Sequence, residues 1–272
     1  MANDDPAPTR YLHGHDDAVL RSHRQRSADN SCAYLLDRLA PDARVLDVGC
    51  GPGTITVGLA ARVPRGEVIG IDTAEAVLEE ARALPGAAGK GNLRFDVGDV
   101  TALEFPDGSF DVVHAHQVLQ HLPDPVAALK EMRRVCRPGG IVAARDGDYG
   151  AMCWHPASAG LNAWQELYRA VARSAGGEPD AGRHLRAWAI AAGFSHVQAT
   201  ASAWCFATDD ERAWWGGLWA ERLTQTRFAE QASAAGLAIA EDLEELAGTW
   251  YAWIELRDAC FIVPHGEALC TP

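Results

Sequence analysis

The stretch from Val45 to Thr54, VLDVGCGPGT, places a carboxylate and three glycines at the end of a short apolar run. Apolar residues at helical spacing follow it, so the glycines are expected on a turn between a strand and a helix. Glycine accepts positive φ and lacks the Cβ that would keep a ligand away from the backbone. The helix beyond the turn presents unpaired N–H groups and a partial positive charge. The sequence therefore predicts a ligand-binding turn.

The residue types around this turn restrict the ligand. A dinucleotide fingerprint, G-x-G-x-x-G, needs glycine where this chain has Thr54, and no G-K-[ST] follows for a phosphate-binding loop. Asp47, two residues before the first glycine, would repel a pyrophosphate but suits a ligand with an ammonium or sulfonium group. The stretch resembles motif I of the class I S-adenosylmethionine (SAM) dependent methyltransferases. A glycine-rich turn without a ligand is the alternative interpretation.

Three further segments resemble that family in their order along the chain. Asp72 ends the second apolar run, where the resemblance implies a carboxylate that binds the ribose hydroxyls. The segment FDVGDV resembles the adenine-recognition motif, with contacts from the Asp99 carboxylate and the Val100 N–H. The run FDVVHAH, which ends at His116, would lie beside the methionyl part of SAM. Each aspartate could instead cap a helix or stabilise a turn.

By this resemblance, SAM would be bound by the glycine-rich turn and by the strand ends that follow it, through Asp47, Gly49, Cys50, Gly51, Gly53, Asp72, Thr73, Asp99, Val100 and His116. Arg26 could bind the methionyl carboxylate, because an arginine fork suits a planar anion. A solvent-exposed helix arginine is the alternative for Arg26. SAM brings an activated methyl group and leaves as S-adenosylhomocysteine, so the protein has to align the acceptor and exclude water.

The segment QVLQH, from Gln117 to His121, faces the methyl-transfer site in the family. Some relatives carry E-x-x-E-H here and bind a divalent metal ion. This chain has glutamine at both carboxylate positions, and a neutral amide is a poor ligand for a hard cation, so we predict no metal. Gln117 and His121 are expected to contact the acceptor. His121 is also a candidate catalytic base, with His116 as a second candidate, because histidine titrates in the right range; a buried histidine that satisfies a backbone group is the alternative.

Residues after the fifth predicted strand are further candidates for acceptor contacts. Asp148 and Tyr149 follow Arg145, and Trp154 interrupts the helical pattern beyond them, where it could form a pocket wall. Tyr11 could contact the acceptor from a lid. Asp146 or Asp148 could instead pair with Arg145, and tryptophans at helical spacing belong to a core more often than to a pocket.

The composition restricts the partners of the protein. Its net charge of −13, with no Lys/Arg cluster beyond Arg133, Arg134 and Arg137, disfavours nucleic acid, because that binding depends on releasing counterions from phosphates. No apolar run approaches the ~18 residues needed to cross a membrane. The acidic, polar start resembles neither a signal peptide nor a transit peptide, so we expect a cytoplasmic protein without membrane insertion. Seven cysteines without a C-x-x-C pair argue against a disulfide framework or a thiolate zinc site. A homodimer is merely the common default.

Strands and helices alternate through the middle of the chain. Strands are expected at Arg44–Val48, Val68–Asp72, Leu93–Val97, Phe110–Ala115 and Ile141–Arg145, with helices at Thr54–Arg62, Ala74–Leu84 and Pro125–Val135. This alternation predicts an α/β, Rossmann-like, doubly wound fold with a mostly parallel sheet of seven strands. Strand-like runs at His196–Phe206 and Ala259–Leu269 would complete the sheet.

Three parts are expected along the chain. Residues 1–40 would form an N-terminal helical lid that includes a helix at Asp29–Leu39, and residues 41–150 would form the SAM-binding core. Residues 151–272 would form the final strands and a helical substrate cap inserted before the last strand. All nine tryptophans lie in this last part, and a capping box, Thr208 with Glu211, marks the start of one cap helix.

The resemblance is closest to the UbiE-like small-molecule methyltransferases, with the RPGG run before the fifth strand as a further mark. The leading hypothesis is methyl transfer from SAM to a small, apolar or aromatic molecule. O-methylation is slightly favoured over C- or N-methylation, because a histidine base is available. Two alternatives keep the fold: a SAM-binding protein that catalyses a cyclisation or decarboxylation, and a ligand-binding module without catalysis.

Overall fold

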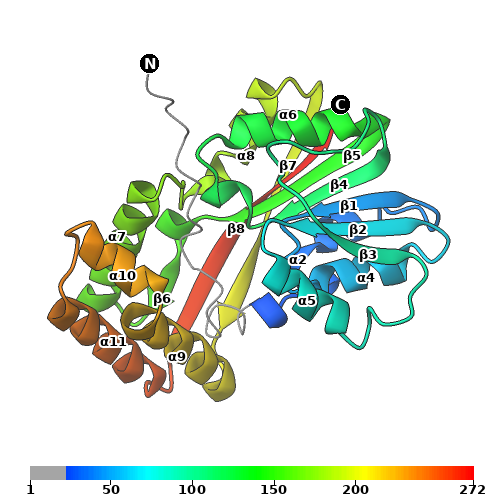
Figure 1. The fold of residues 1–272 in the computed structure, drawn as a ribbon. Coiled ribbons are helices and arrows are strands. Elements are labelled where there is room, and N and C mark those ends of the chain that lie inside the picture. The colour runs from blue at the N-terminus through cyan, green and yellow to red at the C-terminus, as the bar shows by residue number, and fades with distance from the viewer. Residues whose placement is uncertain (1–22) are drawn as a thin grey trace.

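The computed structural model describes residues 23–272, and Figure 1 shows one twisted sheet with helices along it and a group of helices at one end. Tyr11 and the predicted lid up to residue 22 lie outside the described residues. Within residues 23–272, no helix is both long and apolar enough to cross a membrane.

Five parallel strands carry the glycine-rich turn and the segments that resemble the family: β1 (Arg44–Val48), β2 (Glu67–Asp72), β3 (Leu93–Val97), β4 (Phe110–His116) and β5 (Cys136–Gly147). They lie in the order β3-β2-β1-β4-β5. The order reverses between β1 and β4, and ligands of doubly wound sheets bind beyond the carboxyl ends of the strands at such a point. The predicted Rossmann-like arrangement is confirmed.

Two long antiparallel strands, β7 (His196–Phe206) and β8 (Cys260–Thr271), complete the sheet. One edge of β8 pairs with β7. The other edge pairs with the short strand β6 (Cys153–His155) near the start of β8 and with β5 further along. The sheet therefore has eight strands instead of the predicted seven. The extra strand is β6, whose three residues are too few to show the alternation by which strands are recognised.

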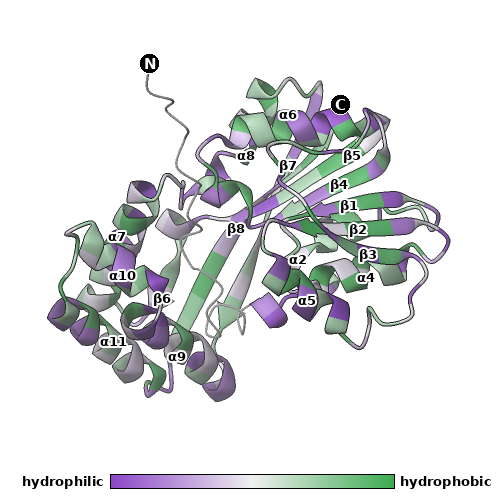
Figure 2. Cartoon of the chain, in the orientation of Figure 1, coloured by the Kyte–Doolittle hydropathy of each residue, from purple (hydrophilic) through white to green (hydrophobic). Residues whose placement is uncertain are grey.

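Helices cover both faces of the parallel strands. The short helices α2 (Ala28–Ser31) and α3 (Ala33–Leu36) lie on one face with α4 (Thr54–Arg62) and α5 (Glu75–Ala83), and α6 (Pro125–Val135) and α8 (Leu185–Ala191) lie on the other. Figure 2 shows apolar residues concentrated along the strands between them. The helix predicted at residues 29–39 is interrupted at Cys32, whose backbone (φ −127°, ψ 12°) is not helical.

The remaining helices form a cap at the far end of β7 and β8 (Figure 1). These are α7 (Ala159–Ser174), α9 (Asp209–Gln225), α10 (Arg227–Ala234) and α11 (Ala240–Ile254). The last three lie between β7 and β8 in the chain, so the predicted insertion before the last strand is confirmed. Trp164, Trp219 and Trp250 are fully buried in the aromatic core of the cap, as the core interpretation of the tryptophans predicted.

Candidate active site

The glycine-rich turn after β1 is a cradle made of backbone. Gly49, Gly51 and Gly53 have φ values of 62°, 53° and 79°, which side chains rarely adopt. A Cβ on Gly49 would overlap a valine side chain, and one on Gly53 would stand 2.8 Å from the ring of Phe95. Among residues 23–272, a Cβ on Gly51 would meet only the His23 side chain, at 3.8 Å. The turn is therefore packed on two sides and open at Gly51.

The helix α4 begins directly at this turn. Gly53 is its N-cap residue, and no side chain within residues 23–272 caps the first turn of the helix. The first backbone N–H groups are therefore left for other partners. Burial, with the carboxylates of Asp47 and Asp72 nearby, raises the pKa of the Cys50 thiol well above its usual value. Cys50 thus adds a neutral thiol to the turn.

The Asp47 carboxylate faces the protein interior. It is 2% exposed, with Oδ1 2.7 Å from His114 Nδ1, while Oδ2 accepts a hydrogen bond of 2.6 Å from Thr56 Oγ1. His114 Nε2 lies 3.2 Å from Cys32 Sγ. Although burial lowers it, the neighbouring Cys32 and Asp47 raise the pKa of His114 to about 10. Asp47 therefore supports the turn from beneath, instead of presenting its carboxylate to a ligand as its place in the motif had predicted.

Asp72, at the end of β2, is bonded to the turn. Its Oδ2 accepts a hydrogen bond from the Gly51 N–H at 3.0 Å, and its Oδ1 accepts one from the Ala74 N–H at 3.1 Å. Ala74 is the N-cap residue of α5, and no described side chain makes a capping hydrogen bond there, so the second bond stabilises the turn before the helix and is not a helix cap. Thr73 beside it is exposed. The carboxylate joins the loops after β1 and β2 and stays half-exposed between them.

Asp99 is exposed in the loop after β3, and the next residue, Val100, is buried. Asp99 Oδ1 accepts hydrogen bonds from the N–H and hydroxyl of Thr101, at 2.8 and 2.7 Å. The Gly98 N–H donates to the Asp72 carbonyl at 3.1 Å, so the loops after β2 and β3 touch. One oxygen of Asp99 thus stabilises a turn, while Oδ2 accepts no hydrogen bond from residues 23–272.

His116 follows His114 by two residues on β4 but has different surroundings. It is 5% exposed, and neither ring nitrogen has a hydrogen-bond partner among the described residues. Burial and the positive charges of Arg26 and Arg145 hold the pKa of His116 well below its usual value. The side chain is therefore a neutral imidazole with two unused nitrogens.

Gln117 connects the end of β4 to two distant parts of the chain. Its Oε1 accepts a hydrogen bond of 2.7 Å from Arg26, and its Nε2 lies 2.8 Å from Nε2 of His265 on β8. Arginine only donates, so Gln117 gives its oxygen to Arg26 and its NH₂ to His265, which accepts through Nε2. The φ of Gln117 is +54°, an uncommon value outside glycine that concentrates at ligand sites.

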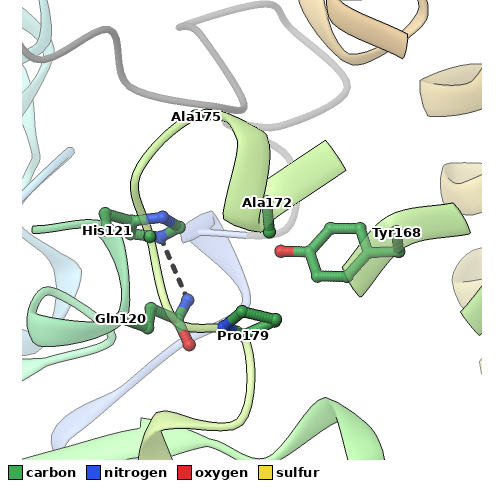
Figure 3. A pocket seen from close by; sticks show the side chains of 7 residues that line it. Gln120, His121, Tyr168, Ala172, Ala175 and Pro179 are labelled. Atoms are coloured by element: carbon green, nitrogen blue, oxygen red, sulfur yellow. Dashed lines mark hydrogen bonds between the residues drawn. The ribbon is translucent and has the colours of Figure 1, made fainter. Parts of the chain in front are cut away.

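The 3-10 helix η1 (Leu119–His121) comes next and lines a first hollow. Figure 3 shows Gln120 and His121 on one side of it, with Tyr168 and Ala172 of α7 on the other. His121 Nε2 lies 3.0 Å from Gln120 Nε2. Burial, together with the charges of Arg26 and Arg222, lowers the pKa of His121 to about 3. An imidazole with this pKa is a weak base near neutral pH. The prediction of a general base rested on a pKa near neutrality, which His121 does not have.

A second hollow lies between the ends of β4 and β5 and the cap. Its wall is mainly aromatic and consists of Tyr149, Trp204, Trp214 and Trp215, with Met152 and Val263. Gln117 and Gly147 line it from the strand ends. Among the residues that the structure describes, its charged lining residues are Arg26 and Arg222. The second hollow is thus a small aromatic chamber with positive charge.

Two of the predicted acceptor residues have different positions in the structure. Tyr149 lines the second hollow, where its ring stacks on Tyr168 with 4.0 Å between ring centroids. Asp148 forms a two-point ion pair with Arg183, at 2.7 and 2.5 Å. It therefore holds the 3-10 helix η3 (Ala181–Arg183) and lines neither hollow, and its partner is not Arg145, as the alternative interpretation had it.

The third, Trp154, lies outside both hollows. It stands on β6, and its ring stacks on Phe261 of β8 with 5.4 Å between centroids. Its edge contacts Trp164 of the cap core. The prediction of a pocket wall at Trp154 is corrected because pairing with β8 places this side chain against the cap core.

Comparison with known proteins agrees with this geometry. A family model described as "Methyltransferase domain" matches residues 39–213. An uncharacterized methyltransferase of Schizosaccharomyces pombe is 36% identical over 267 residues, which is 94% of each chain. The chain belongs to the class I SAM-dependent methyltransferases. The predicted resemblance and enzyme class are therefore confirmed.

Other relatives of this methyltransferase share parts of it. The demethylmenaquinone methyltransferase of Geobacillus kaustophilus is 42% identical over 99 residues, which is 36% of this chain and 42% of that protein. The solved structure of the YcgJ protein of Bacillus subtilis has a TM-score of 0.58 and 19% identity, and the match covers 89% of this chain and 98% of that one. At that identity the second likeness shows the fold alone.

The methyltransferase also has site residues that the sequence did not single out. Arg145 is 1% exposed, with its Nε 3.5 Å from Glu267 and its guanidinium 4.9 Å from the Trp204 ring. His265 packs against the same ring at 4.3 Å. A charged residue inside each of two apolar runs was the available signal for Arg145 and Glu267. No local pattern indicates His265 or Trp204, because the pairing of β7 with β8 brings them together.

No cation-binding cluster is found in the described chain. Within residues 23–272, no three or more His, Cys, Asp or Glu side chains are grouped so that they could hold a metal ion.

Proposed function

We propose that this methyltransferase transfers the methyl group of SAM to a small, apolar or aromatic molecule bound in the second hollow. The observation that carries the proposal is the position of this hollow. It is lined by Gln117 and Gly147, at the ends of β4 and β5, and by tryptophans of the cap on the other side. An aromatic chamber beside the strand ends of a doubly wound sheet suits a small acceptor next to a cofactor.

The strand ends fit SAM. The cradle is open at Gly51, where a cofactor can approach the backbone. Asp72 is half-exposed beside it and would bind the ribose, and Asp99 has an oxygen left for the adenine amino group. Val97, 60% exposed at the end of β3, offers an apolar surface to the adenine ring. SAM, when bound, supplies a methyl group that its sulfonium has already activated.

The end of β4 would hold the methionyl part. Arg26 is oriented by its hydrogen bond to Gln117 and would bind the carboxylate as a fork. His116 stays neutral because of burial and the nearby cations, so it adds no further positive charge beside a sulfonium. Its two unused nitrogens remain available to a bound ligand. These assignments are our proposals for the predicted roles of Arg26, Gln117 and His116.

The two histidines do not decide which atom of the acceptor receives the methyl group. The preference for O-methylation rested on a histidine base. The pKa of His121 is lowered to about 3, mainly by burial, and that of His116 also lies well below its usual value. Both imidazoles are better suited to hydrogen bonding than to removing a proton. The proposal therefore covers transfer to oxygen, nitrogen or carbon.

We also propose the predicted division of the chain: a lid in residues 1–40, the cofactor core in residues 41–150, and a cap with the final strands in residues 151–272. The boundary at residue 40 is supported by α2 and α3, which precede β1. The net charge of −13 supports a small-molecule acceptor over a nucleic acid.

The test is a search for turnover. Purified protein is incubated with SAM and a library of small aromatic alcohols, amines and enols, and mass spectrometry follows S-adenosylhomocysteine and the product. We expect S-adenosylhomocysteine to accumulate one-for-one with a product that has gained a methyl group. Conversion of a library member without S-adenosylhomocysteine, or SAM binding without turnover of any member, would contradict the proposal.

A further inference from the structure

Hydrogen-bond donors dominate the wall of the second hollow. Arg26 and Arg222 carry only donors, and so does the indole of Trp215. Trp215 is 5% exposed, and its Nε1 finds no acceptor within residues 23–272. A buried donor costs free energy unless a ligand or a water molecule accepts from it. The second hollow therefore suits a ligand that carries hydrogen-bond acceptors.

Among the described residues, the same wall offers few acceptors and no negative charge. None of the described residues that line it is aspartate or glutamate. The Gln117 Oε1 atom already accepts from Arg26 at 2.7 Å. Apart from backbone carbonyls and the Tyr149 hydroxyl, the polar side chains among the described lining residues thus carry mainly donors and positive charge.

The two guanidinium groups act on one region of the site. After the larger effect of burial, the charges of Arg26 and Arg222 both lower the pKa of His121. The same two charges oppose the rise that burial causes in the pKa of Tyr149. Arg222 is 5% exposed on α9, with its guanidinium 4.9 Å from the ring centroid of Trp219. An anionic group next to Tyr149 would therefore lie in the field of two cations.

The aromatic walls of the second hollow are fixed by their own contacts. Trp204 is packed against His265 at 4.3 Å and against the Arg145 guanidinium at 4.9 Å. Trp215 stacks on Phe206 with 4.4 Å between centroids and 12° between planes. Rings held in this way offer preformed flat surfaces, so a flat ligand can stack without an ordering cost.

We propose that the methyl acceptor is an aromatic carboxylate, whose ring lies against Trp204 and Trp215 and whose carboxylate binds Arg222. The inference rests on the proposed function, because the second hollow is its acceptor site. An arginine fork binds a carboxylate through two parallel N–H···O bonds, which a neutral amide cannot reproduce. The Trp215 N–H is a further donor for such a group. Arg26 remains with the methionyl end of the cofactor.

Matched pairs of probes test the proposal. The probes are 4-hydroxybenzoate with 4-hydroxybenzamide, and 3-hydroxy-2-naphthoate with its amide, and binding is followed by quenching of tryptophan fluorescence in the presence of S-adenosylhomocysteine. We expect at least one acid to bind about tenfold or more tightly than its amide. Arg222→Met should remove this preference, and Arg222→Lys should keep part of it. Arg186→Met, at an exposed position on α8, is the matched control and should bind like the parent.

Other outcomes would overturn the proposal. Equal affinity for acid and amide in both pairs, or no saturable quenching by either acid, would do so. If circular dichroism shows that Arg222→Met does not fold, the test uses Arg222→Lys and the salt dependence of binding to the parent. A preference for the acids that neither Arg222→Lys nor added salt reduces would contradict an ionic contact. The proposed function fails separately. If labelled SAM methylates neutral aromatic acceptors as well as acids, the proposed function stands and only this inference falls.

Discussion

The network beneath the glycine-rich turn and the wall of the second hollow differ in how their buried polar groups are bonded. Beneath the turn, Asp47 and His114 use both oxygens and both nitrogens in contacts with Thr56, Cys32 and each other. Trp215 lines the second hollow, and the His116 ring lies 5.9 Å from the ring of Trp204, another lining residue. Both are 5% exposed and have ring nitrogens without partners among the described residues. His114 and His116 stand two residues apart on the same strand.

This difference indicates that the network beneath the turn contributes to stability, whereas the unbonded groups are available for binding. A fully bonded buried network fixes the shape of its surroundings, and removing one member leaves another unpaired. Unbonded buried groups weaken the free protein and can be satisfied when a ligand arrives. The pKa shifts of the two histidines have opposite signs for this reason: Asp47 and Cys32 stabilise charge on His114, while burial and neighbouring arginines oppose it on His116.

The largest effect should come from breaking the network beneath the turn. His114→Leu leaves the buried Asp47 carboxylate without its charged partner, so we expect the free energy of unfolding to fall by about 3–5 kcal/mol in urea titrations. His196→Leu, at an exposed position on β7, is the control and should change it little. A loss from His114→Leu no greater than that of the control would mean that the network contributes nothing to stability.

The pH dependence of stability sharpens the same point. The pKa of His114 is about 10 in the folded protein and near 6.5 in the unfolded chain. Its contribution is therefore complete below pH 6.5 and is lost as the pH rises towards 10. Between pH 7 and 9.5, the parent should lose up to ~1.4 kcal/mol per pH unit more than His114→Gln does. Parallel curves for the two proteins would show that His114 is not charged.

At the second hollow, two tryptophans separate the wall from the cap core. Trp215→Leu removes an aromatic wall, and we expect KM for the acceptor to rise about 2- to 12-fold, from the ~0.5–1.5 kcal/mol of an aromatic contact. Trp154→Leu changes a residue that lines neither hollow. When the variant and the parent are assayed at temperatures at which they are equally stable, we expect that KM to be unchanged. If steady-state kinetics showed a larger rise in KM for Trp154→Leu than for Trp215→Leu, Trp154 would belong to the pocket wall.

The smallest effect concerns His121. Because burial and two arginines lower its pKa to about 3, it does not change protonation between pH 5.5 and 8. The pH–rate profile of His121→Asn over this range should therefore have the shape of the parent profile, whatever the change in kcat. Loss of an inflection near pH 6.5 in the variant would show that His121 titrates during catalysis.

Much of the fold could be predicted because its signals are local. The turn glycines and the apolar runs of β1 and β3 mark elements whose bounds the structure reproduces. The bounds predicted for α6, Pro125–Val135, are also reproduced. The break of the predicted N-terminal helix at Cys32 was not predictable in this way. It places the Cys32 thiol against His114, a contact between residues far apart in the sequence.

The acceptor site was less predictable because tertiary pairing creates it. Trp204 and His265 meet only where β7 pairs with β8, and Arg222 reaches the second hollow only after α9 has packed in the cap. Trp154 broke the helical pattern and therefore looked available, but β6 uses it in the sheet. Asp47 carried the right charge for a cationic ligand, and the structure places that charge beneath the turn.

Binding of SAM at the strand ends is the claim on which everything else depends, and calorimetry tests it directly. The parent should bind SAM at micromolar concentrations. Asp72→Ala should weaken binding by about 1.5–3 kcal/mol, as expected for hydrogen bonds to a charged group, while Asp107→Ala, at an exposed carboxylate, should not. Heat from NADH but none from SAM, or equal affinities for Asp72→Ala and the parent, would contradict it.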